Sequence, residues 1–259
     1  MWNNKEFPYL YETHLHTSQA SACAKNTGYD MAKAAHEYGY TGIIVTDHAW
    51  GGNTCVDRSL PWRTWVEQFS LGYMDALRYA ENNDFDVFWG FEAGFNATEF
   101  LIYGLSPEWM MEHPELHDAS VKEMYEIVHS AGAMMIQAHP FRDEDYIPHM
   151  RLFPHHADGI EGINATHSSH LSKSHNNPIY DEMSIVYGNA YDFPFTAGSD
   201  VHTTQMFGGG MAFSHRLNSI DDYIKAVLGR ERYILTNGDA EYMNDTLTRD
   251  YDYSFLRKG

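Results

Sequence analysis

The sequence is poor in cysteine, in basic residues and in long apolar runs. Only Cys23 and Cys55 occur among its 259 residues, so no disulfide framework is indicated. Lysine and arginine number 17, against 36 aspartate and glutamate residues, which gives a net charge of −19. Such a surface repels nucleic-acid phosphates and acidic lipids, and this argues against a nucleic-acid or membrane partner. No run approaches the roughly 20 apolar residues of a membrane span.

The chain also lacks internal repeats, low-complexity tracts and linkers. We therefore expect a single domain over residues 1–259, with a polar tail from about Glu241. The first residues lack the charged segment and apolar core of a secretory signal. A cytoplasmic protein is the expectation, and the oligomeric state stays open.

What the sequence does contain is an alternation of short apolar runs and helical patterns. Runs rich in apolar and β-branched residues predict strands at 7–14, 41–48, 84–93, 99–105, 133–139, 158–164, 193–200 and 232–237. Periodic patterns predict helices at 28–40, 61–83, 120–132, 176–191 and 219–229. This alternation favours an α/β fold of parallel strands with helical crossovers, most simply one closed or nearly closed barrel. In such barrels the active site lies at the carboxyl ends of the strands.

The helix predicted at 120–132 has clear boundary signals. Ser120 is a candidate N-cap, and Glu123 completes the pattern of a capping box. Gly132 is a suitable stop signal at the other end.

Most of the predicted strands carry a histidine or a carboxylate at one end. His14 and His16 close the first strand, Asp47 and His48 close the second, and Glu92 lies near the end of the third. Alternate residues of a strand share a face, so both histidines of the H-x-H pair can point the same way. The later strands add Glu99, His139, Asp200 and His202.

Metal binding is the interpretation that this pattern favours. Histidine is frequent, with 16 copies, so a single H-x-H pair is weak evidence. Taken singly, a strand-end histidine is more often a hydrogen-bonded polar residue, Glu92 could be a salt-bridge partner, and Asp200 could form a turn. However, the packing of an apolar core does not explain why five or six strands each place such a side chain at one rim. Imidazole and carboxylate ligands together suit zinc, iron or manganese.

Five motifs, HLHT, TDH, GFEAG, QAHP and AGSDVH, occur in an order that resembles the PHP superfamily, named for polymerase-associated domains and histidinol phosphatases. The resemblance spans residues 11–202. It implies a distorted, TIM-like (β/α)7 barrel of the PHP type, with two or three divalent metal ions at its rim. It also implies metal-dependent hydrolysis of phosphoesters.

The resemblance further implies which residues hold each metal ion. By position, the three groups of ligands would be His14, His16, Glu92 and Asp200 for the first ion, Glu92 and His139 for the second, and His48 and His202 for the third.

The sequence departs from the family pattern in two places. Many relatives carry a further histidine shortly after H-x-H, where this chain has Ala22 and Cys23. Cys23 could be a soft replacement ligand or an idle thiol. The second departure is Glu99, which stands where relatives have a histidine. A carboxylate can replace it as a ligand and would favour manganese or iron over zinc.

The expected reaction is hydrolysis of a small phosphomonoester, either histidinol-phosphatase-like or on a nucleotide. We expect a hydroxide that bridges the metals to attack phosphorus, with Glu92 as the bridging carboxylate. Asp200 or His202 would accept a proton or assist the leaving group. The sequence does not name the substrate.

Two further features concern the substrate. Arg142 follows the QAHP motif closely and could bind a phosphate through two hydrogen bonds, although a surface salt bridge with Asp143 or Glu144 is the alternative. The loop after the sixth strand carries four basic or titratable residues that we expect to be mainly exposed, namely His167, His170, Lys173 and His175.

Two other functions remain open. Amidohydrolase barrels also begin with H-x-H, although TDH and SDVH fit the PHP pattern better. A catalytically silent metal-binding module is the other alternative, and the retention of Glu92, His139, Asp200 and His202 argues against it.

Overall fold

The structure, a computed structural model, describes residues 2–170 and 175–247. Its strands form a ten-stranded sheet in the order β10-β9-β8-β1-β2-β3-β4-β5-β6-β7. The strands are β1 (Tyr9–Leu15), β2 (Gly42–Val45), β3 (Asp86–Phe95), β4 (Thr98–Tyr103), β5 (Met134–Gln137), β6 (Gly159–Asn164), β7 (Phe195–Gly198), β8 (Gly210–Phe213), β9 (Ile234–Thr236) and β10 (Glu241–Met243).

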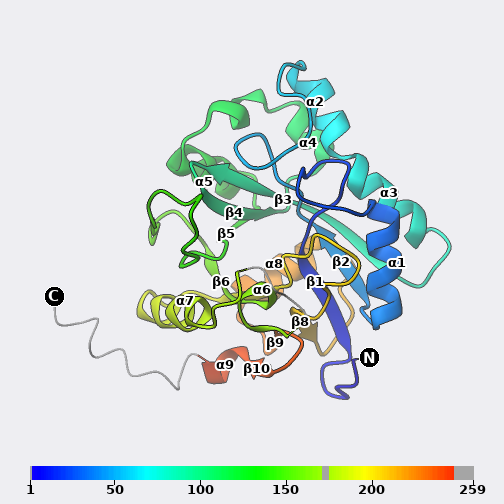
Figure 1. The fold of residues 1–259 in the computed structure, drawn as a ribbon, viewed down its shortest axis with the longest axis vertical. Helices are drawn as coiled ribbons and strands as arrows, with labels where there is room; N and C mark the ends of the chain where they lie inside the picture. Colours follow the sequence, from blue (N-terminus) through cyan, green and yellow to red (C-terminus); the bar gives the residue numbers. More distant parts are fainter. Residues whose placement is uncertain (1, 171–174, 248–259) are drawn as a thin grey trace.

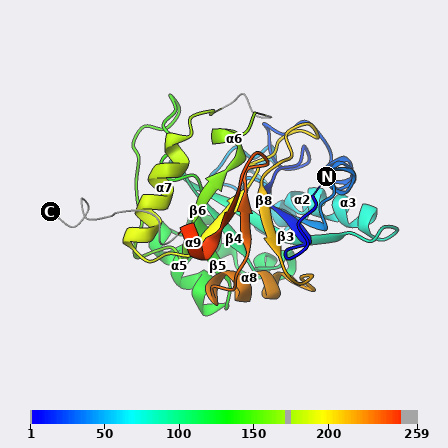
Figure 2. The ribbon, with the colours of Figure 1, turned by 90° about the horizontal axis from the view of Figure 1, so that it is seen from below.

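Helices surround this sheet, with α1 and α3 packed side by side along the β1–β3 part (Figure 1). Seen from below, the strands occupy the centre of the molecule, and α7 and α8 lie on its outside (Figure 2). The helices are α1 (Gly28–Tyr38), α2 (Trp62–Phe69), α3 (Leu71–Ala80), α4 (Pro107–Met111), α5 (Val121–Ser130), α6 (Ala165–Ser168), α7 (Ile179–Ala190), α8 (Ile220–Leu228) and α9 (Asn244–Leu247), with one 3-10 turn at Pro114–Asp118.

The sheet is mixed, whereas the sequence predicts parallel strands. Strands β1 to β3 are parallel, and so are β5 to β7. Strand β4 lies between the two groups and is antiparallel to both neighbours. Strands β8, β9 and β10 extend the β1 edge in antiparallel pairs, and β8 and β10 are not among the predicted strands. The α/β class is confirmed, but the expected count of seven strand–helix units is not.

Strand β1 and the segment after β7 meet, although they are distant in the order of the sheet. Leu15 forms an isolated parallel bridge with Val201. Across it, the backbone N–H of His16 donates to the carbonyl of Val201 at 3.0 Å, and the N–H of Val201 donates to the carbonyl of His14 at 3.2 Å. The sheet therefore curls until the carboxyl ends of its parallel strands face a common space (Figure 1).

Two helix predictions can be compared with the structure directly. The capping box is confirmed, because Ser120 accepts from the N–H of Glu123 and the Glu123 side chain accepts from the N–H of Ser120. The helix predicted at 61–83 is instead two helices, α2 and α3, which meet at Ser70. The Ser70 hydroxyl donates to the carbonyl of Glu67 at 3.1 Å, a local bond that competes with the regular helix pattern.

The apolar core fills the space between the sheet and the helices. Phe69, Phe91 and Tyr103 are fully buried in its larger part, and Leu15 and Met31 are fully buried in the part beneath α1. This packing fixes the strand ends without any disulfide, since both cysteines are free.

The first residues of the predicted polar tail are ordered, because residues 241–247 form β10 and α9. The remainder of that tail, 248–259, lies outside the described residues. Among the residues that the structure describes, no helix is both long and apolar enough to cross a bilayer.

Glycines allow α3 to pack closely against the loop that carries Thr17 and against α1. A Cβ atom on Gly72, in α3, would lie 1.9 Å from Thr17 Oγ1 and 2.9 Å from Asp47 Oδ2. A Cβ atom on Gly28, in α1, would lie 1.9 Å from the carbonyl oxygen of Gly72. Both distances are far inside van der Waals contact, so neither position has room for a side chain.

We therefore predict that Gly72→Ala lowers the free energy of unfolding by about 1–3 kcal/mol, the usual cost of overpacking. Gly52→Ala is the matched control, because its Cβ would have its nearest neighbour at 3.4 Å. Denaturant unfolding of the two variants and the wild type measures the difference. Equal midpoints and slopes for all three proteins would contradict the close packing at Gly72.

Candidate metal centre

The structure brings all the predicted ligands to one end of the sheet. They come from β1, β2, β3, β4, β5 and β7, or from the residues just after these strands. Among the described residues, the groups of three or more potential ligands whose ligand atoms lie within 4.8 Å of one another are His16–His48–His202, His14–His16–Glu92, His14–His139–Asp200 and His48–Glu92–Glu99.

The position of Glu99 follows from the direction of its strand. Strand β4 is antiparallel to β3, and Glu99 is paired with Gly94 near the end of β3. The start of β4 therefore lies at the same rim as the ends of the parallel strands. A strand-opening residue can thus join a site that is otherwise built from strand ends.

Glu92 lies at the centre of the cluster and is fully buried. Its Oε1 is 3.1 Å from His139 Nε2 and 3.4 Å from His14 Nε2. Its Oε2 is 2.6 Å from His48 Nδ1 and 3.8 Å from His16 Nε2. One carboxylate therefore faces four imidazoles that come from different parts of the chain.

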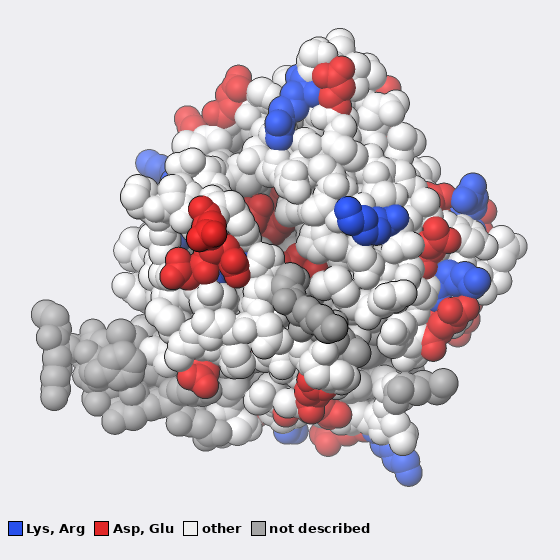
Figure 3. Space-filling view, in the orientation of Figure 1, with Lys and Arg blue, Asp and Glu red and all other residues white. Residues whose placement is uncertain are grey.

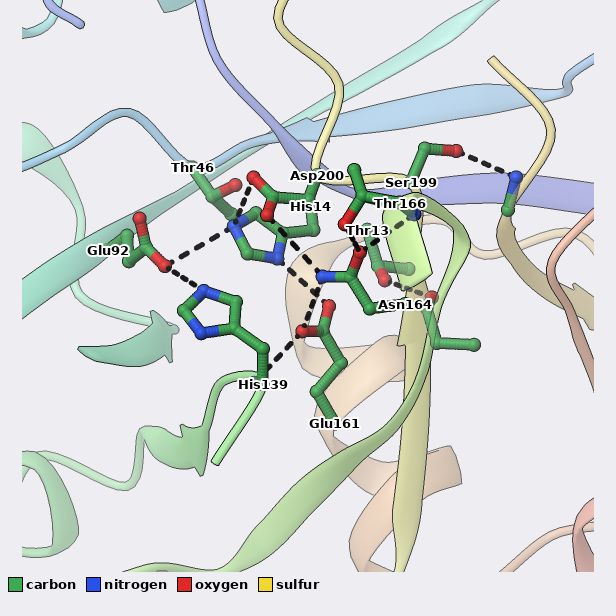
Figure 4. A network of polar contacts seen from close by, with 12 residues as sticks. Thr13, His14, Thr46, Glu92, His139, Glu161, Asn164, Thr166, Ser199 and Asp200 are labelled. Atoms are coloured by element: carbon green, nitrogen blue, oxygen red, sulfur yellow. Dashed lines mark hydrogen bonds and ion pairs between the residues drawn. The ribbon is translucent and has the colours of Figure 1, made fainter. Parts of the chain in front are cut away.

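Asp200 and Glu92 both approach the ring of His14 (Figure 4). The Oδ1 atom of Asp200 is 3.3 Å from His16 Nε2 and 3.6 Å from His14 Nε2. Its Oδ2 accepts from Arg142 Nη2 at 2.6 Å. Asp200 thus has one oxygen directed to the histidines and the other held by an arginine.

His48 and His202 flank His16 on the cavity side. The ring centroids of His16 and His48 are 4.2 Å apart, and those of His16 and His202 are 4.4 Å apart. Cys23 lines the same cavity wall as His202 and His48 and interacts with both. The pKa of the Cys23 thiol falls to about 6, because these contacts outweigh the opposing effect of burial.

Hydrogen bonds at the Nδ1 atoms of His14, His16 and His202 orient these rings, so that the Nε2 atoms face the cluster. His14 Nδ1 lies 2.9 Å from Glu161 Oε1, and His202 Nδ1 lies 2.8 Å from the carbonyl of Asp200. These oxygens accept, so both Nδ1 atoms carry the proton. His16 Nδ1 lies 3.2 Å from the Ser21 hydroxyl, which already donates to a carboxylate. In the neutral form, each of the three rings therefore carries its free lone pair on Nε2, as metal-binding histidines do.

The donor set fits a bound cation. His14 Nε2 and His16 Nε2 are fully buried, and neither has a hydrogen-bond partner within the described part of the chain. An orphaned buried polar atom is costly unless another partner satisfies it. Imidazole and carboxylate groups gathered at this spacing are suited to a borderline or hard divalent ion.

The ionisation of these groups is also suited to a cation. Burial opposes the charge on Glu92, but the charges of His48 and His14 outweigh it and hold the pKa of Glu92 well below its usual range. Burial, with the charges of His48 and His202, lowers the pKa of His16 well below its usual range and leaves the ring neutral. Burial and the nearby charge of Glu92 raise the pKa of Glu99, as expected for two carboxylates that share a site.

The backbone is strained at two of these residues. His139 has φ of +25° and Asp200 has φ of +51°, in a region that residues other than glycine rarely adopt. Such strain collects at functional sites, where the surrounding structure enforces it. Each of the two residues begins the turn that carries the chain away from a strand end.

A cavity of about 540 Å³ opens over the cluster. Figure 3 shows acidic side chains set back in a hollow of this face, and Glu99 and Asp200 are among the cavity-lining residues. The rest of the lining consists of Cys23, His48, Gly51, Gly52, Asn53, Ala97, His139, Arg142, Tyr146, His175 and His202.

Arg142 is buried and is not a surface residue. It pairs with Asp200 and with neither Asp143 nor Glu144 in the described structure. The alternative of a surface salt bridge is therefore wrong. Its place in the cavity wall is compatible with contact to a substrate.

The histidines of the loop after β6 do not share one environment. His167 is buried, so its expected exposure is wrong. His170 is exposed and pairs with Asp239. His175 is partly exposed and lines the cavity. Lys173 lies outside the described residues.

The sequence interpretation missed the carboxylates that support the ligands. Glu161 Oε1 holds the His14 ring, and Glu161 Oε2 accepts from the backbone N–H of His139 at 3.2 Å. Glu12 Oε1 accepts from the N–H groups of His14 and Ser199. Each of these glutamates lies inside a largely apolar, buried strand. Because a charge in such a position needs partners, this pattern was the available signal for their supporting role.

Asp47 also has a supporting role. Its carboxylate accepts from the backbone N–H and hydroxyl of Thr17 at 2.6 and 2.7 Å, and from the hydroxyl of Ser21 at 2.7 Å. Asp47 therefore anchors the loop after β1, and through Ser21 it orients His16.

Comparisons with solved structures identify the same fold. A two-domain protein from Bacteroides vulgatus that contains a predicted PHP-like metal-dependent phosphoesterase has a TM-score of 0.64 and 16% identity, over 91% of this chain and 69% of the other. PsfC from Pseudomonas syringae has a TM-score of 0.56 and 14% identity, over 96% and 95%. A protein from Bifidobacterium adolescentis, named as a candidate metal-dependent phosphoesterase, has a TM-score of 0.51 and 15% identity, over 85% and 96%.

At these identities the structures show the fold alone, and no curated protein matches the sequence. The family is shown by the sequence itself. Residues 12–192, well over half of the chain, match the PHP domain. This range includes six residues of the cluster, namely His14, His16, His48, Glu92, Glu99 and His139, whereas Asp200 and His202 lie beyond it. The chain therefore belongs to the PHP domain family.

Proposed function

We propose that this protein is a metal-dependent phosphoesterase that hydrolyses a small phosphomonoester, such as histidinol phosphate or a nucleotide, in the cytoplasm. The PHP domain supports the class of reaction. The observation that carries the proposal is the convergence of His14, His16 and Glu92, each with an unsatisfied buried ligand atom, beside Asp200 and beneath a cavity. Packing alone would not bury these groups together.

We assign the ligands of two or three cations, zinc, manganese or iron, to the eight clustered residues. The proposed groups are His14, His16, Glu92 and Asp200 for the first, Glu92, His139 and Glu99 for the second, and His48 and His202 for the third.

When bound, such cations neutralise phosphate oxygens and lower the pKa of a coordinated water toward about 7. The residues of this chain hold and orient the reactants. Glu92 can use its two oxygens toward different partners, because they already face separate pairs of histidines. No serine or cysteine nucleophile is required.

We assign proton transfer to His202 or Asp200, which both line the cavity. Burial opposes the charge of Asp200, but His14 and Arg142 hold its pKa well below its usual range, which makes it a weak base. Burial also opposes protonation of His202, but the contact with Cys23 and the charge of Asp200 raise its pKa. With two cations bound and His202 unligated, His202 is therefore the better proton carrier of the two.

Arg142 is the proposed phosphate-binding residue. It lies in the cavity wall beside Asp200, and Tyr146 lines the same wall. A guanidinium held at one edge by the protein can still offer N–H groups to a phosphate oxygen.

We predict that protein loaded with manganese or zinc releases phosphate from members of a panel of small phosphomonoesters, and releases neither ammonia nor acid from a panel of amides. Glu92→Gln should lower turnover at least about a hundredfold, because it removes charge from the centre of the proposed ligands. Its metal content should fall with it.

Glu37→Gln is the matched control, since Glu37 is exposed on α1 and pairs with Lys33 on the same helix. Amide hydrolysis without phosphate release would favour the amidohydrolase alternative. A Glu92→Gln variant with full metal content and full turnover would contradict the role of Glu92.

We also predict unequal reactivity of the two cysteines in metal-free protein. At pH 7 the Cys23 thiol, with a pKa of about 6, is mostly thiolate, whereas burial raises the pKa of Cys55. Iodoacetamide should therefore label Cys23 about tenfold faster than Cys55, despite the greater exposure of Cys55. The Cys23 rate should fall as the pH drops through 6, while the Cys55 rate should still be rising above pH 9.

Peptide mass spectrometry after timed labelling measures both rates. A cation at His48 and His202 should slow the labelling of Cys23 alone. Equal rates at pH 7, or no effect of added zinc, would contradict this arrangement of Cys23.

A further inference from the structure

Three buried side chains extend from Asp200 into the interior, behind the proposed cation site. Arg142 Nη2 donates to Asp200 Oδ2 at 2.6 Å, and Arg142 Nε donates to His167 Nε2 at 3.2 Å. His167 Nδ1 lies 2.7 Å from Asp181 Oδ1. All four residues are less than a tenth exposed. The contacts connect the segment after β7, the segment after β5, helix α6 and helix α7.

The chemistry of the groups fixes the direction of these bonds. An arginine Nε can only donate, so His167 Nε2 must accept. The single ring proton of neutral His167 therefore lies on Nδ1, where it is donated to Asp181. Burial, followed by the charge of Arg142, lowers the pKa of His167 well below its usual range and keeps the ring neutral. The tautomer required by Arg142 is thus the one that Asp181 favours.

Asp181 is itself anchored, so it can fix His167. Its Oδ1 also accepts from the backbone N–H of Asn164 at 3.1 Å, and its Oδ2 accepts from the hydroxyl of Ser168 at 3.1 Å. The same edge of the Arg142 guanidinium has a further contact, because Nη2 also donates to Thr166 Oγ1 at 3.1 Å. Arg142 therefore has little rotational freedom.

The fixed guanidinium determines which oxygen of Asp200 is available. Oδ2 is bound by Arg142 and lies 3.5 Å from Asn164 Nδ2, whereas Oδ1 is directed to His14 and His16. Figure 4 shows the contacts of Asp200 with His14 and Asn164. A guanidinium that could rotate would let the carboxylate turn and would leave its position undefined. Outer-shell partners of this kind usually change metal affinity about 10–100-fold when they are removed.

We propose that His167, oriented by Asp181, is a positioning residue that locks Arg142 and thereby presents Asp200 Oδ1 to a divalent cation. This inference rests on the proposed function, because it takes Asp200 as a metal ligand. His167 itself touches neither cation nor substrate. It would act only through Arg142.

The experiment is a titration of metal-free, full-length protein with Mn²⁺ by calorimetry, with no substrate present. His167→Leu removes the acceptor for Arg142 and should weaken the Mn²⁺ affinity about 10–100-fold. His167→Gln places a carbonyl oxygen near the position of Nε2, still accepts from Arg142, and should restore the affinity to within about threefold of wild type. His170→Leu is the matched control, since His170 is exposed in the same segment, and it should bind Mn²⁺ as the wild type does.

Circular dichroism and thermal unfolding of each variant separate a positioning effect from a folding defect. Should His167→Leu not fold, Asp181→Ala removes the anchor and leaves His167 and Arg142 in place, and it should weaken Mn²⁺ binding in the same direction. Wild-type affinity in the folded His167→Leu or Asp181→Ala protein would overturn the inference. Equal weakening by leucine and glutamine at position 167 would also overturn it, because the glutamine retains the acceptor.

The outcome for the wild type separates this inference from the proposed function. A wild-type protein that binds no Mn²⁺ contradicts the proposed metal site, and the inference falls with it. A wild type that binds Mn²⁺ tightly, beside a His167→Leu variant that binds it equally well, contradicts the positioning role alone.

Discussion

The burial of lone pairs at the rim of the sheet is the constraint on which the rest of this structure depends. Glu92 is fully enclosed, and the imidazoles of His14 and His16 present nitrogen lone pairs that no other described group satisfies. A buried polar group without a partner destabilises the folded state, and the weak contacts around it do not offset that cost. A divalent cation bound here would resolve the conflict, because it would give these lone pairs a partner and offset the carboxylate charge.

The fold supplies the geometry that this cluster needs. Parallel strands bring their carboxyl ends to one rim, and the antiparallel β4 adds a residue from its beginning at the same rim. The bridge between Leu15 and Val201 then brings the first strand against the segment after β7. Without that curl, His14 and Asp200 would lie on separate parts of the sheet.

Much of the site could be predicted because strand periodicity and residue chemistry agree there. His14, His16 and Glu92 lie in or just after apolar runs. The sequence therefore predicts that they lie near strand ends, at one edge of the sheet. The supporting residues were not readable in this way. Glu161 sits within a strand and not at its end, and nothing local shows that its partner is His14, 147 positions away. The loop that contains His167 is polar in composition, and such a composition predicts an exposed side chain, whereas His167 is buried.

The fold was predictable in class but not in detail, for a related reason. Strand direction depends on how a chain crosses the sheet, and the sequence between 93 and 99 gives only a short connection. Such a length permits only an antiparallel pair, yet the strand–helix alternation elsewhere favoured a uniform parallel sheet. Strand β8, at Gly210–Phe213, is four residues long, too short for its periodicity to stand out.

Metal analysis of protein purified without chelator, combined with anomalous diffraction from its crystals, tests the central claim most directly. The account predicts two or three cations per chain, within bonding distance of His14, His16, Glu92, His139 and Asp200. Crystals with no anomalous peak among these side chains, even after soaking with manganese, iron and zinc, would contradict it.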